Sequence, residues 1–214
     1  ADDYEIKPTG CHGFCERGTL VLMHPEKRLY QRVKPDAVPE IVEKTLKGGE
    51  ALEQHFYDNP ATGEKYELED DIPFYKHQER LILGQNGEID PTSIDDYIAK
   101  GGYGALVKAL EMGPDDVLDQ VKKATLRGRG GGGFPAGRKW ETCRNAEADK
   151  RYVICNADEG DPGAFMDRSI LEGNPHAVIE GMIIGAFTIG SDEGYVYVRH
   201  EYPLAVERLT IALE

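Results

Sequence analysis

The sequence has no apolar stretch long enough to cross a membrane, and it has little cysteine. Its longest apolar run, residues 177–190, is short and is interrupted by Glu180 and by glycines, whereas a membrane helix needs about 20 apolar residues. The opening ADDYEIKPTGC lacks the charged and apolar regions of a secretory signal. Four cysteines in 214 residues are too few for a disulfide framework. We therefore expect a cytoplasmic protein with no direct membrane insertion.

Positive charge is also scarce. The chain has 25 Lys and Arg against 39 Asp and Glu, for a formal net charge of −14. This balance argues against nucleic acid as the main partner. A hydrophobic content of 40% is enough for a real core, and the length suits one large domain or one and a half smaller ones.

Turn and periodicity signals divide the chain into three parts. Residues 1–48 hold a Cys- and Gly-rich loop, two short strand-like runs around the turn HPEK and an amphipathic helix. Residues 49–90 are polar and aromatic without a sustained period, and we predict a linker that wraps a surface. Residues 91–214 alternate between helical and strand patterns, which indicates an α/β domain. The final strand–helix pair has no strand after it, so we expect an incomplete sheet.

The stretch LRGRGGGGFPAGRKWE, residues 126–141, is basic although the chain is acidic. Six glycines fall within the ten positions 128–137. Each glycine loses much backbone entropy when it becomes ordered. The stretch therefore needs a ligand or a packing reason for so much bare backbone.

Two known phosphate-binding patterns fit this stretch poorly. Residues 128–133 read G-x-G-x-x-G, the dinucleotide fingerprint, but that motif needs a preceding strand, and DDVLDQVKKATL before it has a helical pattern. Residues 132–137 approach a P-loop. Arg138 and Trp140, however, occupy the positions of its lysine and its magnesium-binding hydroxyl.

Two further interpretations remain. A flexible, solvated loop is disfavoured by Phe134, Pro135 and Trp140. Successive bare amides can instead form a nest that binds an anion, with Lys139 as a point charge. The surplus glycine would let a flat ring lie directly on the backbone.

A second signal, CNADEGDPGAFMDR at residues 155–168, leaves a predicted strand and enters an acidic loop. Asn156 can both donate and accept hydrogen bonds, which suits the imide and carbonyl edge of a flavin. Helix capping and solvated acids are the alternative, above all for Asp167. A metal site is a further alternative, although the acids fit no calcium-loop spacing.

Three segments in this order resemble the NADH- and FMN-binding subunit of respiratory complex I. They resemble still more the β subunits of NAD-linked [FeFe] hydrogenases and NAD-dependent formate dehydrogenases. The segments are LRGRGGGGFPAGRKWE, YVICNADEGDPGAFMDRSILEGNPHAVIEGMIIGAFTIG and YVYVRHEYPLAVERL. The resemblance covers essentially the whole chain and implies an N-terminal fragment of such a subunit.

This resemblance implies a fold for each part of the chain. Residues 91–214 would be the N-terminal part of a Rossmann-like FMN- and NADH-binding α/β domain, incomplete at its C-terminus. Residues 1–48 would be the C-terminal half of a thioredoxin-like [2Fe-2S] domain, with residues 49–90 as linker. A [4Fe-4S] cluster would belong to the missing C-terminal part.

The resemblance also implies roles for individual residues. The glycine loop would lie against FMN and NADH, Phe134 would stack near the adenine, and Lys139 would contact the flavin phosphate. Asp161 would help to hold the nicotinamide nucleotide, although it is one methylene shorter than the glutamate of complex I. The remaining implied contacts to the two cofactors are Gly128, Gly130, Gly131, Gly132, Asn156, Asp158, Glu159, Tyr197 and Glu201. No side chain is required as a catalytic acid or base, because the cofactor carries the chemistry.

TGCHGFCERG places Cys11 and Cys15 in a glycine-rich loop. From their spacing alone they could be half of an iron–sulfur or zinc site, or a pair of idle thiols. The resemblance implies the second cysteine pair of a [2Fe-2S] cluster whose first pair lies upstream. His12 could ligate metal, but an exposed loop histidine is the preferred interpretation. We interpret Cys143 and Cys155 as structural.

The implied function is that of an FMN-dependent NAD(H) oxidoreductase (diaphorase) subunit. It would transfer hydride between NADH and FMN and single electrons to the iron–sulfur clusters of a larger redox complex. The implied partners are a small ferredoxin-like subunit and a hydrogenase or formate dehydrogenase catalytic subunit. The alternative is an electron-relay or assembly module that keeps the fold but does not itself turn over NADH.

Overall fold

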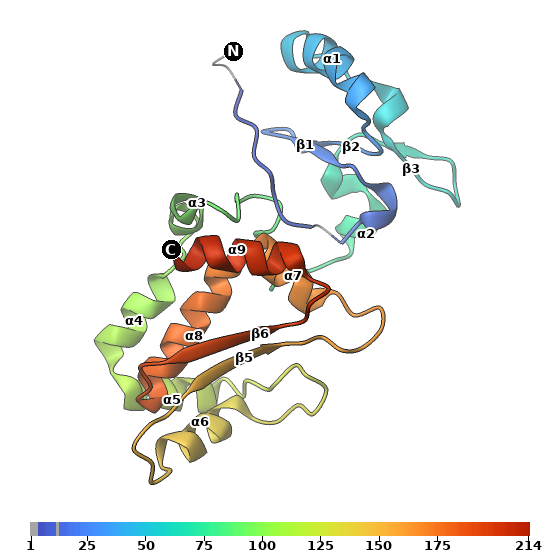
Figure 1. Ribbon diagram of the computed structural model, residues 1–214. Helices are drawn as coiled ribbons and strands as arrows, with labels where there is room; N and C mark the ends of the chain where they lie inside the picture. Colours follow the sequence, from blue (N-terminus) through green and yellow to red (C-terminus); the bar gives the residue numbers. More distant parts are fainter. Residues whose placement is uncertain (1–3, 12) are drawn as a thin grey trace. The chain divides into compact units, whose positions relative to one another are not determined.

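The computed structural model describes residues 4–11 and 13–214, which belong to two compact units (Figure 1). Unit 1 contains the N-terminal segment as far as Cys11 together with Ile82–Glu214, and unit 2 contains His12–Leu81. His12, the candidate metal ligand, lies outside the described residues. No helix among those residues is both long and apolar enough to cross a membrane.

Unit 2 is built from short elements around an aromatic core. Phe14 stacks on Phe74 with ring centroids 4.4 Å apart, and Leu29 and Ile72 are fully buried beside them. The two predicted strands around HPEK pair as an antiparallel hairpin, as expected. The elements of this unit are η1 (Cys15–Arg17), β1 (Val21–Met23), β2 (Arg28–Tyr30), η2 (Pro35–Ala37), α1 (Val38–Glu40), η3 (Ile41–Lys47), η4 (Glu53–His55), β3 (Tyr57–Asp58), β4 (Lys65–Tyr66), η5 (Glu69–Asp71) and α2 (Pro73–Lys76).

The predicted linker, residues 49–90, is not a separate segment in the structure. Residues 49–81 fold with the preceding part of the chain, and Leu52, Tyr57 and Tyr75 are buried in its cores. Each short element contributes only one or two side chains, so no helical or strand period marks them in the sequence. The unit boundary therefore falls after Leu81 rather than at residues 48 and 90.

Unit 1 is an α/β arrangement of helices on a parallel pair of strands. β5 and β6 pair in parallel with Asn156 opposite Tyr197 and Ala157 opposite Val198. Parallel strands need a crossover, and two helices supply it. The elements are α3 (Ile94–Ala99), α4 (Gly104–Met112), α5 (Pro114–Lys123), α6 (Ala136–Arg144), β5 (Val153–Ala157), α7 (Met166–Gly173), α8 (Pro175–Ile189), β6 (Gly194–Val198) and α9 (Pro203–Leu213).

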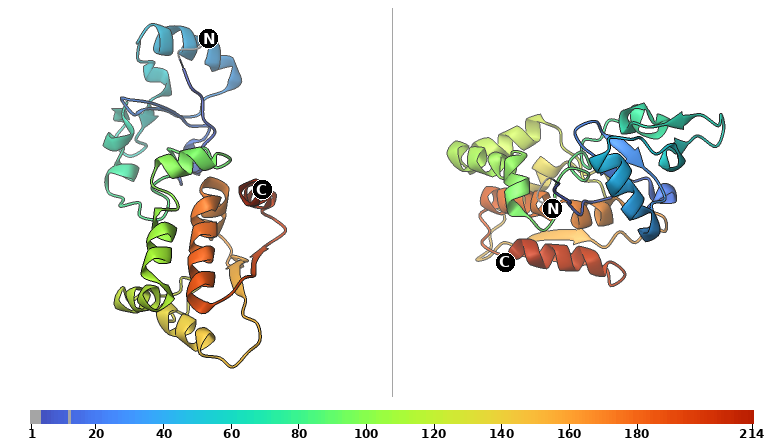
Figure 2. Two further views of the ribbon diagram at one scale, coloured as in Figure 1. Left: turned by 90° about the vertical axis from the view of Figure 1, so that its left-hand side faces the viewer. Right: turned by 90° about the horizontal axis from the view of Figure 1, so that it is seen from above.

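The two faces of the strand pair have different environments. Side chains alternate across a strand, and Ala157 and the partly buried Val196 and Val198 pack toward the core formed with α7, α8 and α9. The opposite face is open, with Ile154 68% and Tyr197 58% exposed. Figure 2 shows α8 and α9 on one side of the strands.

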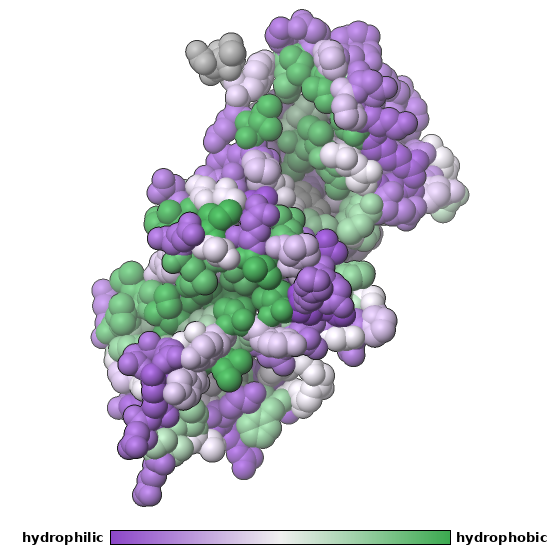
Figure 3. All heavy atoms as spheres, viewed as in Figure 1, coloured by the Kyte–Doolittle hydropathy of each residue, from purple (hydrophilic) through white to green (hydrophobic). Residues whose placement is uncertain are grey.

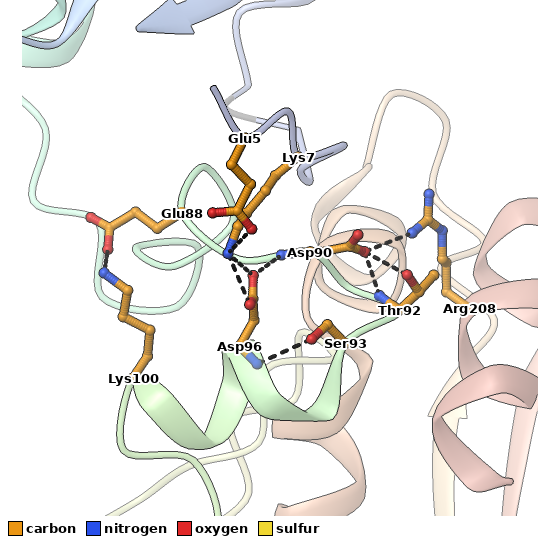
Figure 4. A network of polar contacts seen from close by, with 9 residues as sticks. All are labelled: Glu5, Lys7, Glu88, Asp90, Thr92, Ser93, Asp96, Lys100 and Arg208. Carbon is orange, nitrogen blue, oxygen red and sulfur yellow. Dashed lines mark hydrogen bonds and ion pairs between the residues drawn. The ribbon is translucent and has the colours of Figure 1, made fainter. Parts of the chain in front are cut away.

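A polar network anchors the N-terminal segment within unit 1 (Figure 4). The Lys7 ammonium lies 2.8 Å from a carboxylate oxygen of Asp96. Ser93 caps α3 by accepting the Asp96 amide at 3.2 Å. Asp90 accepts from Thr92 and pairs with Arg208 of α9 at 3.7 Å. The start of the chain, α3 and α9 are thus joined although they lie far apart in sequence.

Unit 1 also carries an apolar groove, and Figure 3 shows hydrophobic residues gathered over α4, α8 and α9. The groove has a volume of about 780 Å³ and is lined by aliphatic and aromatic side chains such as Leu110, Ile183, Phe187 and Val206. Such a lining offers little to a phosphorylated ligand, so the glycine loop is the better candidate for an anion site.

Candidate functional site

The glycine loop is closed at its neck by backbone hydrogen bonds. The Ala136 amide donates to the Leu126 carbonyl at 2.8 Å, and the Gly128 amide donates to the Phe134 carbonyl at 2.9 Å. The Arg127 Nε adds a brace by donating to the Gly133 carbonyl at 2.6 Å. Residues 129–133 therefore form a tip held on a fixed neck. The element before the loop is the helix α5, which agrees with rejecting the dinucleotide fingerprint and the P-loop.

The tip of the loop presents bare amides. Within the part of the chain that the structure describes, the amides of Gly130, Gly131 and Gly132 donate no hydrogen bond. A Cβ added at any of these three positions would meet no atom within 4 Å. Gly131 has φ +95° and Gly133 has φ +58°, which favours glycine over residues with a side chain. Successive free amides beside open space are the requirement for an anion nest under a flat ligand.

A side chain is excluded at Gly137, the sixth glycine of the stretch, for a different reason. Gly137 is buried in α6, and a Cβ there would lie 2.8 Å from Lys122 Cγ and 3.0 Å from the Lys122 amide nitrogen on α5. A side chain would therefore push α5 and α6 apart. Gly137 serves helix packing rather than ligand binding.

Cations and an aromatic ring border the loop on its α6 side. Lys139 lies in the first turns of α6 and is exposed, and in the described chain its ammonium contacts no carboxylate. Phe134 is 48% exposed, and the Arg138 guanidinium lies over its ring at 6.0 Å from the centroid. The first turn of a helix adds a partial positive charge to these groups.

The carboxyl ends of β5 and β6 form the second part of the candidate site. Asn156 and Tyr197 are neighbours in the register, and both side chains are exposed. The loops that leave the two strands start from the same edge, as parallel pairing requires. Figure 1 shows the loop after β5 and the glycine loop between α5 and α6 projecting toward the same side of unit 1.

Glu159, predicted at the flavin edge, has a carboxylate that is already engaged. One oxygen accepts the Asp167 amide at 2.8 Å, and the other accepts the Arg168 amide at 3.1 Å and the Tyr202 hydroxyl at 3.1 Å. These amides belong to the first turn of α7, so Glu159 caps that helix from a distance. Its backbone, at φ +44°, is held by Arg199, which donates to its carbonyl at 2.8 Å.

The neighbouring acids are less enclosed. Asp158 donates its amide to the Asn156 side-chain oxygen at 3.1 Å, which fixes the amide side chain at the strand end. Asp161 is exposed on the same loop. Burial raises the pKa of Asp167, and the nearby charge of Glu159 raises it further. The capping role weighed for Asp167 thus falls to Glu159, whose carboxylate receives the amides of α7.

Glu201 lies just beyond β6 and pairs with Arg199, whose guanidinium reaches its two oxygens at 3.2 and 2.9 Å. The hydrogen bond from Arg199 lowers the pKa of Glu201 to about 2. Glu201 therefore stays an anion throughout the neutral range. Arg199 joins the two loops because it also holds Glu159.

The cysteines fall in different surroundings. Cys11 is half-buried in unit 1, Cys15 is exposed in unit 2, and each has polar or electrostatic neighbours. Over residues 4–11 and 13–214, no three His, Cys, Asp or Glu side chains gather in an arrangement that could hold a metal ion. Cys155 is on the inner face of β5, where burial raises the pKa of its thiol. The structural interpretation of Cys155 agrees with this position.

Sequence reasoning missed three residues that shape the site. Arg127 braces the loop tip, and Arg199 and Tyr202 hold Glu159. Arg199 stands two residues before Glu201 in the predicted strand end, and that spacing could have indicated an ion pair. Nothing in the sequence relates Arg127 to the Gly133 carbonyl, because that contact depends on the curvature of the loop.

Comparison with known proteins agrees with this geometry. Residues 121–214 match the Nuo51 FMN-binding domain. The NADP-reducing hydrogenase subunit HndC of Solidesulfovibrio fructosivorans is 55% identical over 139 residues, which is 65% of this chain and 28% of that protein. The F subunit of NADH-quinone oxidoreductase from Aquifex aeolicus is 52% identical over 122 residues, which is 57% of this chain and 28% of that protein.

A solved structure is similar over a longer part of the chain. An NAD+-reducing [NiFe]-hydrogenase in its air-oxidised state matches with a TM-score of 0.51 and 28% identity, over 95% of this chain and 32% of that chain. The matched part of the chain spans only 28% of the length of HndC and 28% of the length of the Aquifex aeolicus F subunit. Residues 121–214 thus match the Nuo51 FMN-binding domain, and the chain is similar to NADH-quinone oxidoreductase F subunits and to subunits of NAD- and NADP-reducing hydrogenases.

Proposed function

We propose that the chain is the flavin- and dinucleotide-binding part of an FMN-dependent NAD(H) oxidoreductase subunit. The observation that carries this proposal is the row of bare amides at Gly130, Gly131 and Gly132, on a loop with a fixed neck and with open space where side chains would lie. These residues fit a phosphate-bearing planar ligand, because amides can bind the anion and no side chain obstructs the ring. When bound, FMN supplies hydride acceptance.

The residues of the chain have separate roles in this proposal. Amides of the loop tip and Lys139 bind and orient the flavin phosphate, and the open face over Gly131 leaves room for the nicotinamide. Phe134 offers a ring for the adenine of the dinucleotide. Asn156 and Tyr197 stand at the strand ends where the ring edge is expected. Glu159 acts through α7, whose start it caps, and through Arg199. We therefore assign Glu159 to positioning of the loop. Asp158, Asp161 and Glu201 stay candidates for direct contact.

Replacing Lys139 with alanine should weaken FMN binding by about ten- to a hundredfold, since a charge-assisted contact to phosphate contributes roughly 1.5–3 kcal/mol. Flavin occupancy at limiting FMN, measured by absorbance of the full-length subunit after gel filtration, would show the loss. The matched control is Lys108→Ala, because Lys108 is an exposed lysine of α4 in the same unit. Equal occupancy in Lys139→Ala and the wild type would exclude Lys139 as the phosphate ligand.

We further propose that electrons leave the site singly toward iron–sulfur clusters of a larger complex. HndC is a subunit of a hydrogenase, and the Aquifex aeolicus relative is a subunit of a quinone oxidoreductase, which supports a multi-subunit partner. A small ferredoxin-like subunit, a hydrogenase or formate dehydrogenase catalytic subunit, and a cytoplasmic location stay predictions. The same holds for the thioredoxin-like [2Fe-2S] fold of residues 1–48 and for a [4Fe-4S] cluster elsewhere in the subunit.

Cys11 and Cys15 are proposed as half of a [2Fe-2S] ligand set. A cluster of this kind needs four ligands, and Cys143 and Cys155 lie on α6 and β5 of unit 1. Residues 1–214 expressed alone should therefore give no stoichiometric cluster signal in electron paramagnetic resonance after reduction. A full signal from this polypeptide would mean that other residues complete the ligand set.

A further inference from the structure

Two arginines at the glycine loop contact neither an acidic group nor a backbone carbonyl among the described residues. In the described part of unit 1, arginines elsewhere have partners: Arg144 pairs with Asp115, Arg168 with Glu172 and Arg208 with Asp90. Arg127 and Arg151 donate to backbone carbonyls, and Arg199 pairs with Glu201. Arg129 and Arg138 have neither kind of partner there, and both are exposed.

These guanidinium groups are surplus to the flavin site proposed above. The flavin phosphate is already provided with the bare amides of the loop tip and with Lys139. In a chain of net charge −14, acids are abundant enough to neutralise exposed arginines, yet none approaches these two within ion-pair distance among the described residues. An unpaired planar guanidinium is suited to bidentate binding of a second phosphate.

The position of Arg138 indicates which phosphate this is. Its guanidinium lies over the Phe134 ring, 6.0 Å from the centroid. Phe134 is the ring proposed to stack on adenine, and the 2′-phosphate of NADP(H) is carried by the ribose attached to that adenine. A stacked adenine would therefore bring the 2′ position within reach of the flexible Arg138 side chain. In dinucleotide sites an acid that bonds the 2′-hydroxyl favours NAD, whereas an arginine accommodates the 2′-phosphate.

We propose that the dinucleotide site accepts NADP(H) as well as NAD(H), with Arg138 as the residue that binds the 2′-phosphate and Arg129 as a supporting positive charge. The inference rests on the proposed function, because it places the adenine on Phe134. It goes further by assigning a subsite and a specificity-determining residue.

The test uses the full-length FMN-loaded subunit and two probes, adenosine 2′,5′-bisphosphate and 5′-AMP, in phosphate-free buffer. Isothermal titration calorimetry should show that the bisphosphate binds at least about tenfold more tightly than 5′-AMP, as expected for one charge-assisted phosphate contact. Arg138→Gln should remove most of this difference. Arg138→Lys should restore part of it, because lysine keeps the charge but loses the bidentate fork.

Arg32→Gln is the matched control, since Arg32 is an exposed arginine of unit 2 with no carboxylate at ion-pair distance among the described residues. It should keep the wild-type preference. Equal binding of the two probes by the wild type would overturn the inference, and so would an unchanged preference in Arg138→Gln. Loss of FMN from Arg138→Gln would assign Arg138 to the flavin phosphate and would also overturn it.

Failure of the 2′-phosphate subsite can be told apart from failure of the proposed function by a separate measurement. Bleaching of the bound flavin by NADH reports the oxidoreductase activity alone. A protein that NADH bleaches but that does not distinguish the probes would retain the proposed function and lose the 2′-phosphate subsite. A protein that prefers the bisphosphate but that neither dinucleotide bleaches would keep the subsite and lose the hydride chemistry.

Discussion

Replacing Gly131 with valine should remove fast reduction of the bound flavin by NADH, while dithionite still reduces the flavin. Gly131 has φ +95°, and a Cβ on it would meet no atom within 4 Å. The space in front of it is where we place the nicotinamide, which must lie flat between the backbone and the flavin ring. Hydride transfer needs reacting atoms about 3–3.5 Å apart, and a displacement of about 1 Å can lower the rate about a hundredfold.

Stopped-flow absorbance at flavin wavelengths is the measurement, on a full-length subunit that retains FMN. We expect the NADH-driven rate of Gly131→Val to fall on the order of a hundredfold. Gly131→Ala bears the same unfavourable φ with far less bulk, so it should lose much less. Gly181→Val is a control on the exposed side of α8, where a Cβ also meets nothing within 4 Å. An unchanged rate in Gly131→Val would contradict the nicotinamide role, and loss of FMN itself would assign the glycine to the flavin.

Replacing Glu180 with leucine should lower the free energy of unfolding by about 3 kcal/mol, at roughly 1 kcal/mol for each of the three donors left without this acceptor. Glu180 is 7% exposed on α8. Its carboxylate accepts from the Tyr97 hydroxyl at 2.5 Å, the Tyr103 amide at 3.0 Å and the Leu106 amide at 2.9 Å. The two amides belong to the start of α4, whose first residues need an acceptor.

Aromatic neighbours pack around this network. Tyr103 donates to or accepts from the His176 ring at 2.9 Å, and His176 stacks on Tyr97 with centroids 5.5 Å apart. Burial raises the pKa of Tyr97 well above its ordinary value, and the bond to Glu180 raises it further. The Tyr97 hydroxyl therefore remains a donor in the neutral range.

Urea unfolding followed by far-ultraviolet circular dichroism would measure the loss. Glu111→Leu is the matched control, because Glu111 is exposed on α4, and exposed substitutions usually change stability by less than about 0.5 kcal/mol. A Glu180→Leu variant as stable as Glu111→Leu would show that Glu180 is not the acceptor that holds α4 on α8.

The long patterned elements of this protein could be predicted from the sequence, and the short ones could not. Apolar periodicity and β-branched runs located the strands β5 and β6 and the helices α5, α8 and α9. The prediction of a linker was wrong over residues 49–81 because isolated aromatic residues carry no period, although they fill the core of unit 2.

Some features of the candidate site could also be predicted from the sequence, and others could not. Local composition indicated the glycine loop, whereas Asn156 and Tyr197 were expected from the resemblance alone. The parallel register that places them side by side is a finding of the structure. The function of Gly137 could not be separated from that of the loop glycines, because it depends on Lys122 of the neighbouring helix. The capping of α7 by Glu159 could not be predicted, because its partner amides lie eight and nine residues further along the chain.

The two parts of the site also differ in the sequence separation of the residues that form them. The neck of the glycine loop joins Leu126 to Ala136 and Gly128 to Phe134, a closure within about ten residues that takes on the order of 10–100 ns. Asn156 meets Tyr197 only after about forty intervening residues have been ordered, and such distant pairing slows folding. A newly made chain would therefore close the neck of the glycine loop well before it brings the ends of β5 and β6 together.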